Sequence, residues 1–427
     1  MSQNPSDHDA DQDNQEEAPK RATMPIGDVM VYLQRGQMIE NVKIPRLKLK
    51  GVFEKPVRFK NCLLAHVDFD GAVFEDKVEM IRCTIDRPRC SHRTHFKSDW
   101  DCSESTFNNA VIREMTIDGH FKCRAIRAKT KLQFLDCEFK GKYFFWEAHI
   151  DGWFEHKKCV FYDECDIRSM HVEQGLIFRE CRFEKNLTAR GMVVHKKVEF
   201  VDSTAERMVD FSKAKLHDFV YLETLKGGQL QQFAFLNALA ERLLIRPEQL
   251  QHRLASENEG RYDDAMQEYG LLKRCYENLH RYDFQDWAFY RFKVNQRRGA
   301  GHSWSRPWTK LTQFFNWSML DLGCGYGTNP FRAVVASIII ITFFGAIYMA
   351  DINSLEVANL PFEGTKEDWP NRTMIGLLTS VSVFTSGMAG IRDLAKGWMN
   401  IPLVIESLLG TLLFGLFIVA FSRKVIR

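Results

Sequence analysis

The eight residues LQFLDCEF at positions 132–139 return in outline as LIFRECRF at positions 176–183. Both stretches contain a bulky residue, any residue, a bulky residue, two mostly polar residues, a small residue, any residue and a last bulky residue. The pattern also occurs at residues 57–64, 78–85 and 198–205, the last with Ser203 where the others have cysteine. One such unit cannot cover its own apolar side, so we expect successive units to stack into a solenoid.

The cysteines indicate the length of the repeat. Intervals of 19 to 22 residues separate the members of two series, Cys62, Cys83, Cys102 and Cys123, followed by Cys137, Cys159 and Cys181. A coil of about 20 residues holds several short strands, and cysteine is a compact apolar residue for its narrow interior. We therefore expect a solenoid over residues 23–225, with one or two irregular coils in residues 86–131, where the pattern fits poorly. The alternative is a generic strand-rich domain.

Three cysteines stand two residues before a phenylalanine, in the pairs Cys137 and Phe139, Cys159 and Phe161, and Cys181 and Phe183. In this respect the region resembles the pentapeptide-repeat family, which places a small Ala or Cys two residues before a central Phe or Leu. The resemblance implies a right-handed quadrilateral β-helix, in which each coil has four five-residue sides.

A second interpretation concerns the same region. Cys83, Cys90, His92 and His95 lie within 13 residues and are of the types that bind zinc. Their spacing matches no zinc-finger pattern well, and Cys83 already has a place in the repeat. We therefore favour the repeat over a metal site.

The charges restrict the function classes. Lys and Arg number 58 against 55 Asp and Glu, a net charge of +3, which argues against a uniformly basic nucleic-acid binder. Residues 1–22 carry six acidic and two basic residues and little apolar surface, so we expect them to be disordered. They lack the apolar core of a secretory signal. We therefore expect a cytoplasmic solenoid with reduced cysteines.

Residues 226–300 change to a helical period. Apolar residues between Gln229 and Ile245 predict one helix that ends before Pro247, and a second helical region runs from about Tyr262 to Arg298. The second region is rich in aromatic residues and ends in basic ones. It resembles the connector of pentapeptide-repeat proteins that end in a two-helix ion-channel module.

The C-terminal part contains three uncharged or nearly uncharged runs. Residues 333–350 carry no charge, residues 401–421 carry only Glu406, and residues 374–391 carry none. Basic residues before the first run and after the last place both ends in the cytoplasm, which requires an even number of crossings. We expect spans at about 333–350 and 401–422, after a linker at 301–332, and a segment at 372–391 that enters and leaves on one side. Residues 325–327 (GYG) precede the first span, and we interpret them as the flexible approach to it.

The turn after the middle segment reads Thr385, Ser386, Gly387, Met388, Ala389, Gly390. It resembles the filter Thr-Val-Gly-Tyr-Gly-Asp of two-transmembrane potassium-type channels at Thr385 and Gly387 and departs from it at the last three positions. The resemblance implies a tetrameric cation pore in residues 333–427, with monovalent cations as permeant ions.

The second span carries three further candidates. Glu406 either hydrogen-bonds the re-entrant segment from behind or attracts cations. Gly410 and Gly415 either let the inner helix bend during gating or let helices approach closely.

These observations predict a homotetrameric cation channel in a cell inner membrane, with cytoplasmic termini and a solenoid that docks an unknown ligand or protein. The alternative is a non-conducting membrane-anchored scaffold. No nucleophile elbow, P-loop or metalloprotease motif is found. We expect no enzymatic activity, no cofactor and no nucleic-acid partner.

Overall fold

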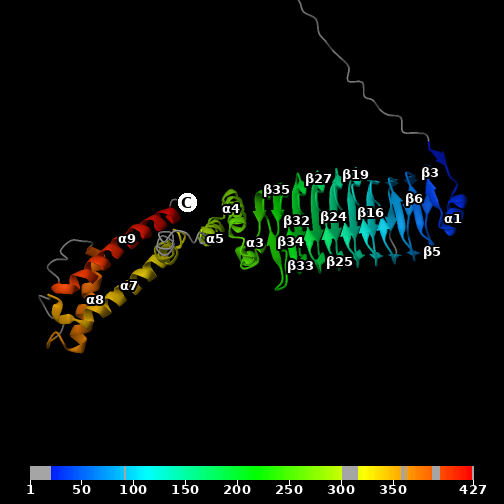
Figure 1. Ribbon diagram of the computed structural model, residues 1–427. Helices are drawn as coiled ribbons and strands as arrows, with labels where there is room; N and C mark the ends of the chain where they lie inside the picture. Colours follow the sequence, from blue (N-terminus) through cyan, green and yellow to red (C-terminus); the bar gives the residue numbers. More distant parts are fainter. Residues whose placement is uncertain are drawn as a thin grey trace, which may run out of the picture.

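The computed structural model describes residues 21–90, 93–300, 316–356, 361, 363–386 and 395–425. The predicted disorder of residues 1–22 falls almost wholly outside this range. A parallel β-solenoid of short strands begins at β1 (Ala22–Thr23), and helix α1 (Ile26–Gln34) packs on its first turn (Figure 1). Helices follow its last turn, so the chain combines a β-solenoid with a helical C-terminal part.

The solenoid strands form three sheets, in which every paired strand is parallel to its neighbour. The 10-stranded sheet contains one strand from each turn: β2 (Met38–Glu40), β6 (Val57–Lys60), β10 (Val78–Ile81), β14 (Trp100–Asp101), β18 (Phe121–Lys122), β22 (Tyr143–Phe144), β26 (Cys165–Asp166), β30 (Leu187–Thr188), β34 (Met208–Asp210) and β36 (Gln232–Ala234). The 8-stranded sheet contains β5 (Gly51–Phe53), β9 (Ala72–Phe74), β13 (Thr94–Phe96), β17 (Met115–Ile117), β21 (Glu138–Phe139), β25 (Val160–Phe161), β29 (Arg182–Phe183) and β33 (Thr204–Ala205).

The 19-stranded sheet joins two neighbouring ladders. One ladder holds β1, β3 (Val42–Ile44), β7 (Leu63–Ala65), β11 (Thr84–Asp86), β15 (Thr106–Asn108), β19 (Arg127–Ala128), β23 (His149–Ile150), β27 (His171–Val172) and β31 (Val193–Val194). The other holds β4 (Leu47–Lys48), β8 (Val67–Asp68), β12 (Arg89–Cys90), β16 (Ala110–Arg113), β20 (Leu132–Leu135), β24 (Trp153–Lys157), β28 (Gly175–Arg179) and β32 (Lys197–Val201). The longer strands β35 (Lys215–Tyr221) and β37 (Leu239–Leu244) belong to both.

Aromatic side chains fill the interior as ladders that follow the repeat. Phe139, Phe161 and Phe183 are buried and stack with ring centroids 5.1 and 4.8 Å apart. Burial of large apolar side chains is the main stabilising term available to such a narrow core. The phenylalanine two residues after Cys137, Cys159 or Cys181 is therefore a core residue.

The small residues lie in separate rows. Cys137, Cys159, Cys181 and Ser203 are in register, as predicted from their spacing. The predicted first series is wrong as a single row, because Cys62 and Cys83 are in register with Ser105, whereas Cys102 and Cys123 pair with each other in another row. The interval of 19 residues between Cys83 and Cys102 marks this change of row. A short interval therefore reflects a shift around the coil and not a shorter coil.

The irregular coils expected in residues 86–131 are not found in the described part of that segment. Strands β12 to β19 all pair with strands of the neighbouring turns. The irregularity lies later, where the pairing of β35 with β37 shifts between Leu216 and Phe219. Backbone hydrogen bonds to the turns on both sides keep the backbone of a turn regular, even where its side chains depart from the repeat pattern.

The helix predicted for residues 229–245 is replaced by strands β36 and β37. Phe233, Phe235 and Leu243 are buried, while Leu239 is 59% exposed and does not belong to an apolar helical face. The open edges of β34 and β35 supply hydrogen-bond partners for these residues. Tertiary pairing thus overrides the local helical spacing.

Four helices follow: α2 (Pro247–Leu250), α3 (Ala255–Asn258), α4 (Tyr262–Asn278) and α5 (Tyr282–Ala300). Helix α4 covers the last turn and satisfies its backbone. The Glu268 carboxylate accepts a hydrogen bond from the Phe235 N–H at 2.6 Å, and the Tyr276 hydroxyl donates to the Ile245 carbonyl at 2.8 Å. An unpaired strand edge is a template for aggregation, so α4 acts as a cap.

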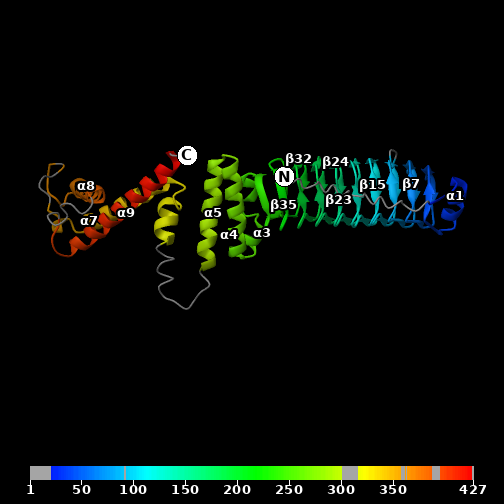
Figure 2. The same cartoon turned by 90° about the horizontal axis from the view of Figure 1, so that it is seen from above.

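The C-terminal part contains the π-helical segment η1 (Asn316–Leu322), α7 (Pro330–Ala350), the 3₁₀ segment η2 (Ile352–Ser354), α8 (Trp369–Ser386), the 3₁₀ segment η4 (Gly397–Met399) and α9 (Asn400–Val425). Among the described residues, the segments of α7 and α9 are the two that are long and apolar enough to cross a membrane. Their exposed surface includes Phe331, Ile338, Phe343, Phe414 and Val419. Figure 2 shows α7, α8 and α9 together, beyond α4 and α5.

Candidate functional site

Helix α8 crosses α7 at two glycines. A Cβ atom on Gly376 would lie 2.6 Å from Cγ of Met349 and 2.8 Å from the carbonyl oxygen of Gly345. The 2.8 Å contact with a backbone oxygen excludes a side chain at position 376, whereas a Cβ on Gly345 would lie 3.1 Å from Cδ2 of Leu377. The close approach of the two helices therefore depends mainly on Gly376. This crossing fixes α8 against the first apolar helix.

Helix α9 approaches the other end of α8 at Gly410. A Cβ atom there would lie 2.3 Å from the carbonyl oxygen of Phe384, whereas a Cβ atom on Gly415 would meet no atom within 4 Å. Of the two roles predicted for these glycines, this geometry favours close helix approach at Gly410. At Gly415, close helix packing does not require a glycine among the described residues.

Glu406 connects the three helices. Its side chain is fully buried, and it accepts a hydrogen bond of 2.6 Å from the Tyr348 hydroxyl of α7. Its other carboxyl oxygen is hydrogen-bonded to the Ser380 hydroxyl of α8, which also lies 2.9 Å from the Ile341 carbonyl oxygen. This arrangement favours the predicted supporting role over a cation-attracting role, because α8 belongs to the segment predicted to re-enter.

The filter-like residues begin at the C-terminal end of α8. The Thr385 hydroxyl donates a hydrogen bond of 2.7 Å to the Val381 carbonyl within that helix, and α8 ends at Ser386. Gly387, Met388, Ala389 and Gly390 lie outside the described residues. Thr385 and Ser386, the first two residues of the predicted turn, therefore belong to helix α8.

The approach to α7, which we predicted to be flexible, is a defined turn. Gly325, Tyr326 and Gly327 all have positive φ angles, between 56° and 79°. The Asn329 side chain then accepts a hydrogen bond from the Phe331 N–H at the start of α7. Successive left-handed residues redirect the chain sharply before the helix begins.

Asp321 was not predicted from the sequence and anchors this turn. Its carboxylate accepts hydrogen bonds from the Tyr290 hydroxyl at 2.9 Å and from the Arg297 guanidinium at 2.6 Å. Arg332, at the start of α7, donates to the Asp321 carbonyl oxygen at 3.2 Å. Asp321 thereby links the connector helix α5 to the first apolar helix. In the sequence, the one feature that could have indicated this role is that Asp321 is a single acidic residue in an otherwise uncharged stretch.

A second connection joins α5 to the end of α9. The Arg423 guanidinium donates to the Asp286 carboxylate at 3.0 Å, and it lies 4.4 Å from the centre of the Phe289 ring. Arg423 is one of the basic residues after the last uncharged run, from which the membrane orientation was predicted. The sequence contains no local signal for a contact between residues 137 positions apart.

The cysteine and histidine cluster near residue 90 does not form one site in the described part of the chain. Cys83 lies in a buried row of small residues, and burial raises the pKa of the Cys90 thiol. His95 instead bonds the Asp118 carboxylate at 2.7 Å. His92 lies outside the described residues.

Comparisons of the chain with protein-family models, with curated proteins and with solved structures found no match.

Proposed function

We propose that this protein is a membrane ion channel, in which four copies of the α7–α8–α9 unit surround a cation-conducting pore. The observation that carries the proposal is the packing of α8 against both apolar helices, with its end directly before residues 387–390. One unit with two spanning helices cannot enclose a pore by itself. Four copies would bury part of the exposed apolar surface of α7 and α9 against one another.

In this proposal α8 is re-entrant, and monovalent cations are coordinated by the backbone from the C-terminal end of α8, at Thr385 and Ser386, through the following residues 387–390. Non-helical backbone is tolerated at membrane depth where it lines a water-filled cavity, and carbonyl oxygens replace the hydration shell of the ion. Glu406 and Gly410 hold α8 against the inner helix α9 behind this stretch. By the positive-inside rule, the basic residues at both ends of the module support a cytoplasmic location for both chain termini in a cell inner membrane.

The solenoid is then a cytosolic domain, which we infer to be a right-handed quadrilateral β-helix of the pentapeptide-repeat type. The pattern of small residue and phenylalanine supports this inference, as does a turn such as β18 to β21, which contains four successive strands. Contacts from α5 to Asp321 and to Arg423 join this domain to both apolar helices. A ligand or protein on the solenoid that prefers one arrangement of these contacts would bias the pore.

The proposal is tested by ion flux through purified full-length protein in liposomes, with potassium and sodium gradients compared. Gly387→Val should abolish flux while the tetramer persists, because a β-branched side chain restricts the backbone that must turn toward the ion. Gly27→Val in α1 is the matched control, since a Cβ there meets no atom within 4 Å. An ionophore added at the end identifies intact vesicles. Equal flux through Gly387→Val, or an assembly smaller than a tetramer, contradicts the proposal.

A non-conducting scaffold is the second candidate. It is favoured by Met388, Ala389 and Gly390, which depart from the filter pattern at three successive positions. A well-assembled wild-type tetramer without flux under either gradient supports the scaffold. In that case Gly387→Val should leave both assembly and partner binding unchanged.

A further inference from the structure

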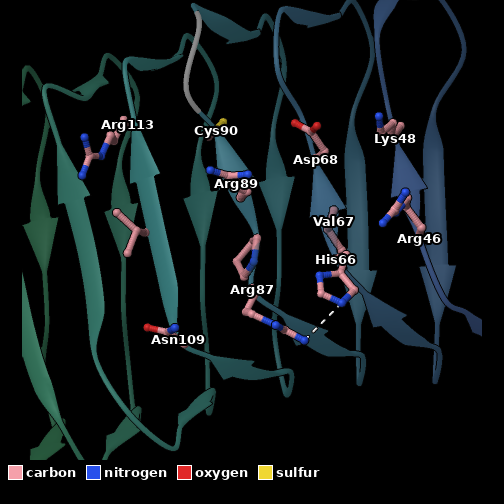
Figure 3. A pocket seen from close by; sticks show the side chains of 12 residues that line it. Arg46, Lys48, His66, Val67, Asp68, Arg87, Arg89, Cys90, Asn109 and Arg113 are labelled. Atoms are coloured by element: carbon pink, nitrogen blue, oxygen red, sulfur yellow. Dashed lines mark hydrogen bonds between the residues drawn. The ribbon is translucent and has the colours of Figure 1, made fainter.

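The first four turns of the solenoid share a hollow of about 780 Å³ on the 19-stranded sheet (Figure 3). Five cationic side chains and one carboxylate, Asp68, are among its lining residues, and the cations are Arg46, Lys48, Arg87, Arg89 and Arg113. Figure 3 shows Arg46 and Lys48 at one end, Arg113 at the other, and Arg87 and His66 between them. The hollow is therefore strongly positive.

Several cations elsewhere on the solenoid surface are neutralised by carboxylates. These lysines and arginines pair with carboxylates one turn away, as in Arg82 with Glu104 at 2.6 Å and Lys122 with Asp99 at 2.6 Å. Among the described residues, no carboxylate lies within ion-pair distance of Arg46, Lys48, Arg89 or Arg113. Asp68 lies in register between Lys48 and Arg89 on adjacent strands and is the one carboxylate among the residues that line the hollow. The lining therefore keeps an excess of positive charge, which an anionic ligand would compensate.

The central pair is held in place by its neighbours. The Arg87 guanidinium lies 3.1 Å from Nε2 of His66 and 3.1 Å from the Asp86 carboxylate. His66, Arg87 and Asn109 occupy the same corner of three successive turns, each with a φ near 50°. These left-handed corners place the three side chains one above the other at the base of the hollow.

The geometry points to a binding site for a small soluble polyphosphate, such as a nucleoside or inositol polyphosphate. Four of the five cations that line the hollow are arginines. The planar guanidinium group can donate two parallel hydrogen bonds to the oxygens of a phosphate. Neighbouring strands are about 4.8 Å apart, so cations on four turns span roughly 14 Å and can meet successive phosphates. The volume is that of a small-molecule site, which is about 300–1,000 Å³. Figures 1 and 2 place these turns at the end of the solenoid far from α7 and α9, which argues against a lipid headgroup.

This inference does not depend on the proposed channel function. Calorimetric titration of the full-length protein in detergent micelles with tripolyphosphate should show saturable binding with one site per chain. Inorganic phosphate should bind more weakly, and added salt should lower the affinity for both. Arg89→Gln combined with Arg113→Gln should weaken tripolyphosphate binding by about a hundredfold, because each of the two lost charge-assisted hydrogen bonds costs about tenfold.

The matched control combines Lys185→Gln with Arg190→Gln, two exposed cations elsewhere on the solenoid that have no ion pair among the described residues. It should bind tripolyphosphate like the wild type, and circular dichroism should show equal melting for both variants. The inference is overturned by a wild type that does not bind tripolyphosphate, by an equal loss in the control, or by binding only to phosphoinositide vesicles or only to duplex DNA.

Discussion

Cysteine and serine occupy the small positions of the solenoid because each donates a hydrogen bond from a site without room for a larger side chain. Cys159 Sγ lies 3.3 Å from the Phe134 carbonyl oxygen of the preceding turn, and Ser203 Oγ lies 3.1 Å from that of Phe178. Both side chains are fully buried. These positions therefore require a small side chain that can donate a hydrogen bond, and neither a disulfide nor a metal is needed to explain the residue type.

This account predicts unequal effects of two substitutions at Cys159. Cys159→Ser should cost less than about 1.5 kcal/mol, because the hydroxyl keeps the hydrogen bond. Cys159→Leu should cost about 1–3 kcal/mol, because it overpacks the row. Thermal unfolding of the full-length protein, followed by circular dichroism, measures the difference. Equal destabilisation by the two variants would contradict the size argument.

His156 occupies a bulky position of the repeat and behaves as an aromatic residue. Its ring is fully buried between Phe134 and Phe178, with centroids 5.1 and 4.8 Å away. Nε2 lies 3.0 Å from the Tyr143 hydroxyl, while Nδ1 has no partner among the described residues. Burial lowers the pKa of His156 to about 3, so the ring stays neutral at physiological pH.

A lowered pKa makes this histidine an acid-sensitive element. Its stabilising contribution is present above its ordinary pKa of about 6.5 and is lost as the pH falls toward the folded value. Replacing His156 and Tyr143 together by phenylalanine should remove this loss, which is about 1.4 kcal/mol per pH unit in that window. Unfolding midpoints at several pH values for both proteins measure the effect. Parallel acid profiles for the two proteins would argue against it.

At the scale of elements, the C-terminal module depends on close helix crossings. Two of these are made by glycines facing backbone carbonyls, at Gly376 and at Gly410. Side-chain packing and interhelical hydrogen bonds, such as those of Glu406, associate helices in an apolar surrounding. Helix α8 is thereby held along its length by both of its neighbours.

Gly410 and Gly415 offer a matched pair of substitutions on one helix. Gly410→Ala should lower the thermal stability of the detergent-solubilised protein, because the added methyl group would lie 2.3 Å from the Phe384 carbonyl oxygen. The expected cost is about 1–3 kcal/mol. Gly415→Ala should be neutral or slightly stabilising, since alanine favours a helix over glycine. A larger loss at Gly415 than at Gly410 would show that the α8–α9 crossing is not the limiting contact.

At the scale of the whole molecule, the connector helix α5 joins the solenoid to the apolar helices. It packs on α4, which caps the last turn, and it contacts Asp321 before α7 and Arg423 at the end of α9. A displacement of the solenoid would therefore reach both ends of the C-terminal module through one helix.

The contact of Arg423 with Asp286 should be energetically coupled. In a double-mutant cycle of Arg423→Gln and Asp286→Asn, the two effects on stability should deviate from additivity by about 0.5–3 kcal/mol. Hydrogen exchange of the last turn of α9 should rise in each single variant, and the double variant should add little. Additive effects would mean that the two side chains act separately.

Much of the architecture follows from local sequence pattern. The alternation of bulky and small residues determines which side chains face the interior, and this holds from β6 to β33 because each strand is short and pairs with a copy of itself. The uncharged runs locate α7 and α9, since length and composition alone decide whether a helix is apolar enough to span a membrane. The likeness of residues 385–390 to a filter is likewise a property of the local sequence.

Other features depend on residues that meet only in the folded chain. Residues 232–244 have helical spacing, yet the open edge of the preceding turn makes them strands. Asp286 and Arg423 carry no local signal for each other, and the cations of the first four turns come together only because the coils stack. Hydrogen bonding to a neighbouring edge and charge across turns are non-local interactions, so their outcome is set by which segments the fold places side by side.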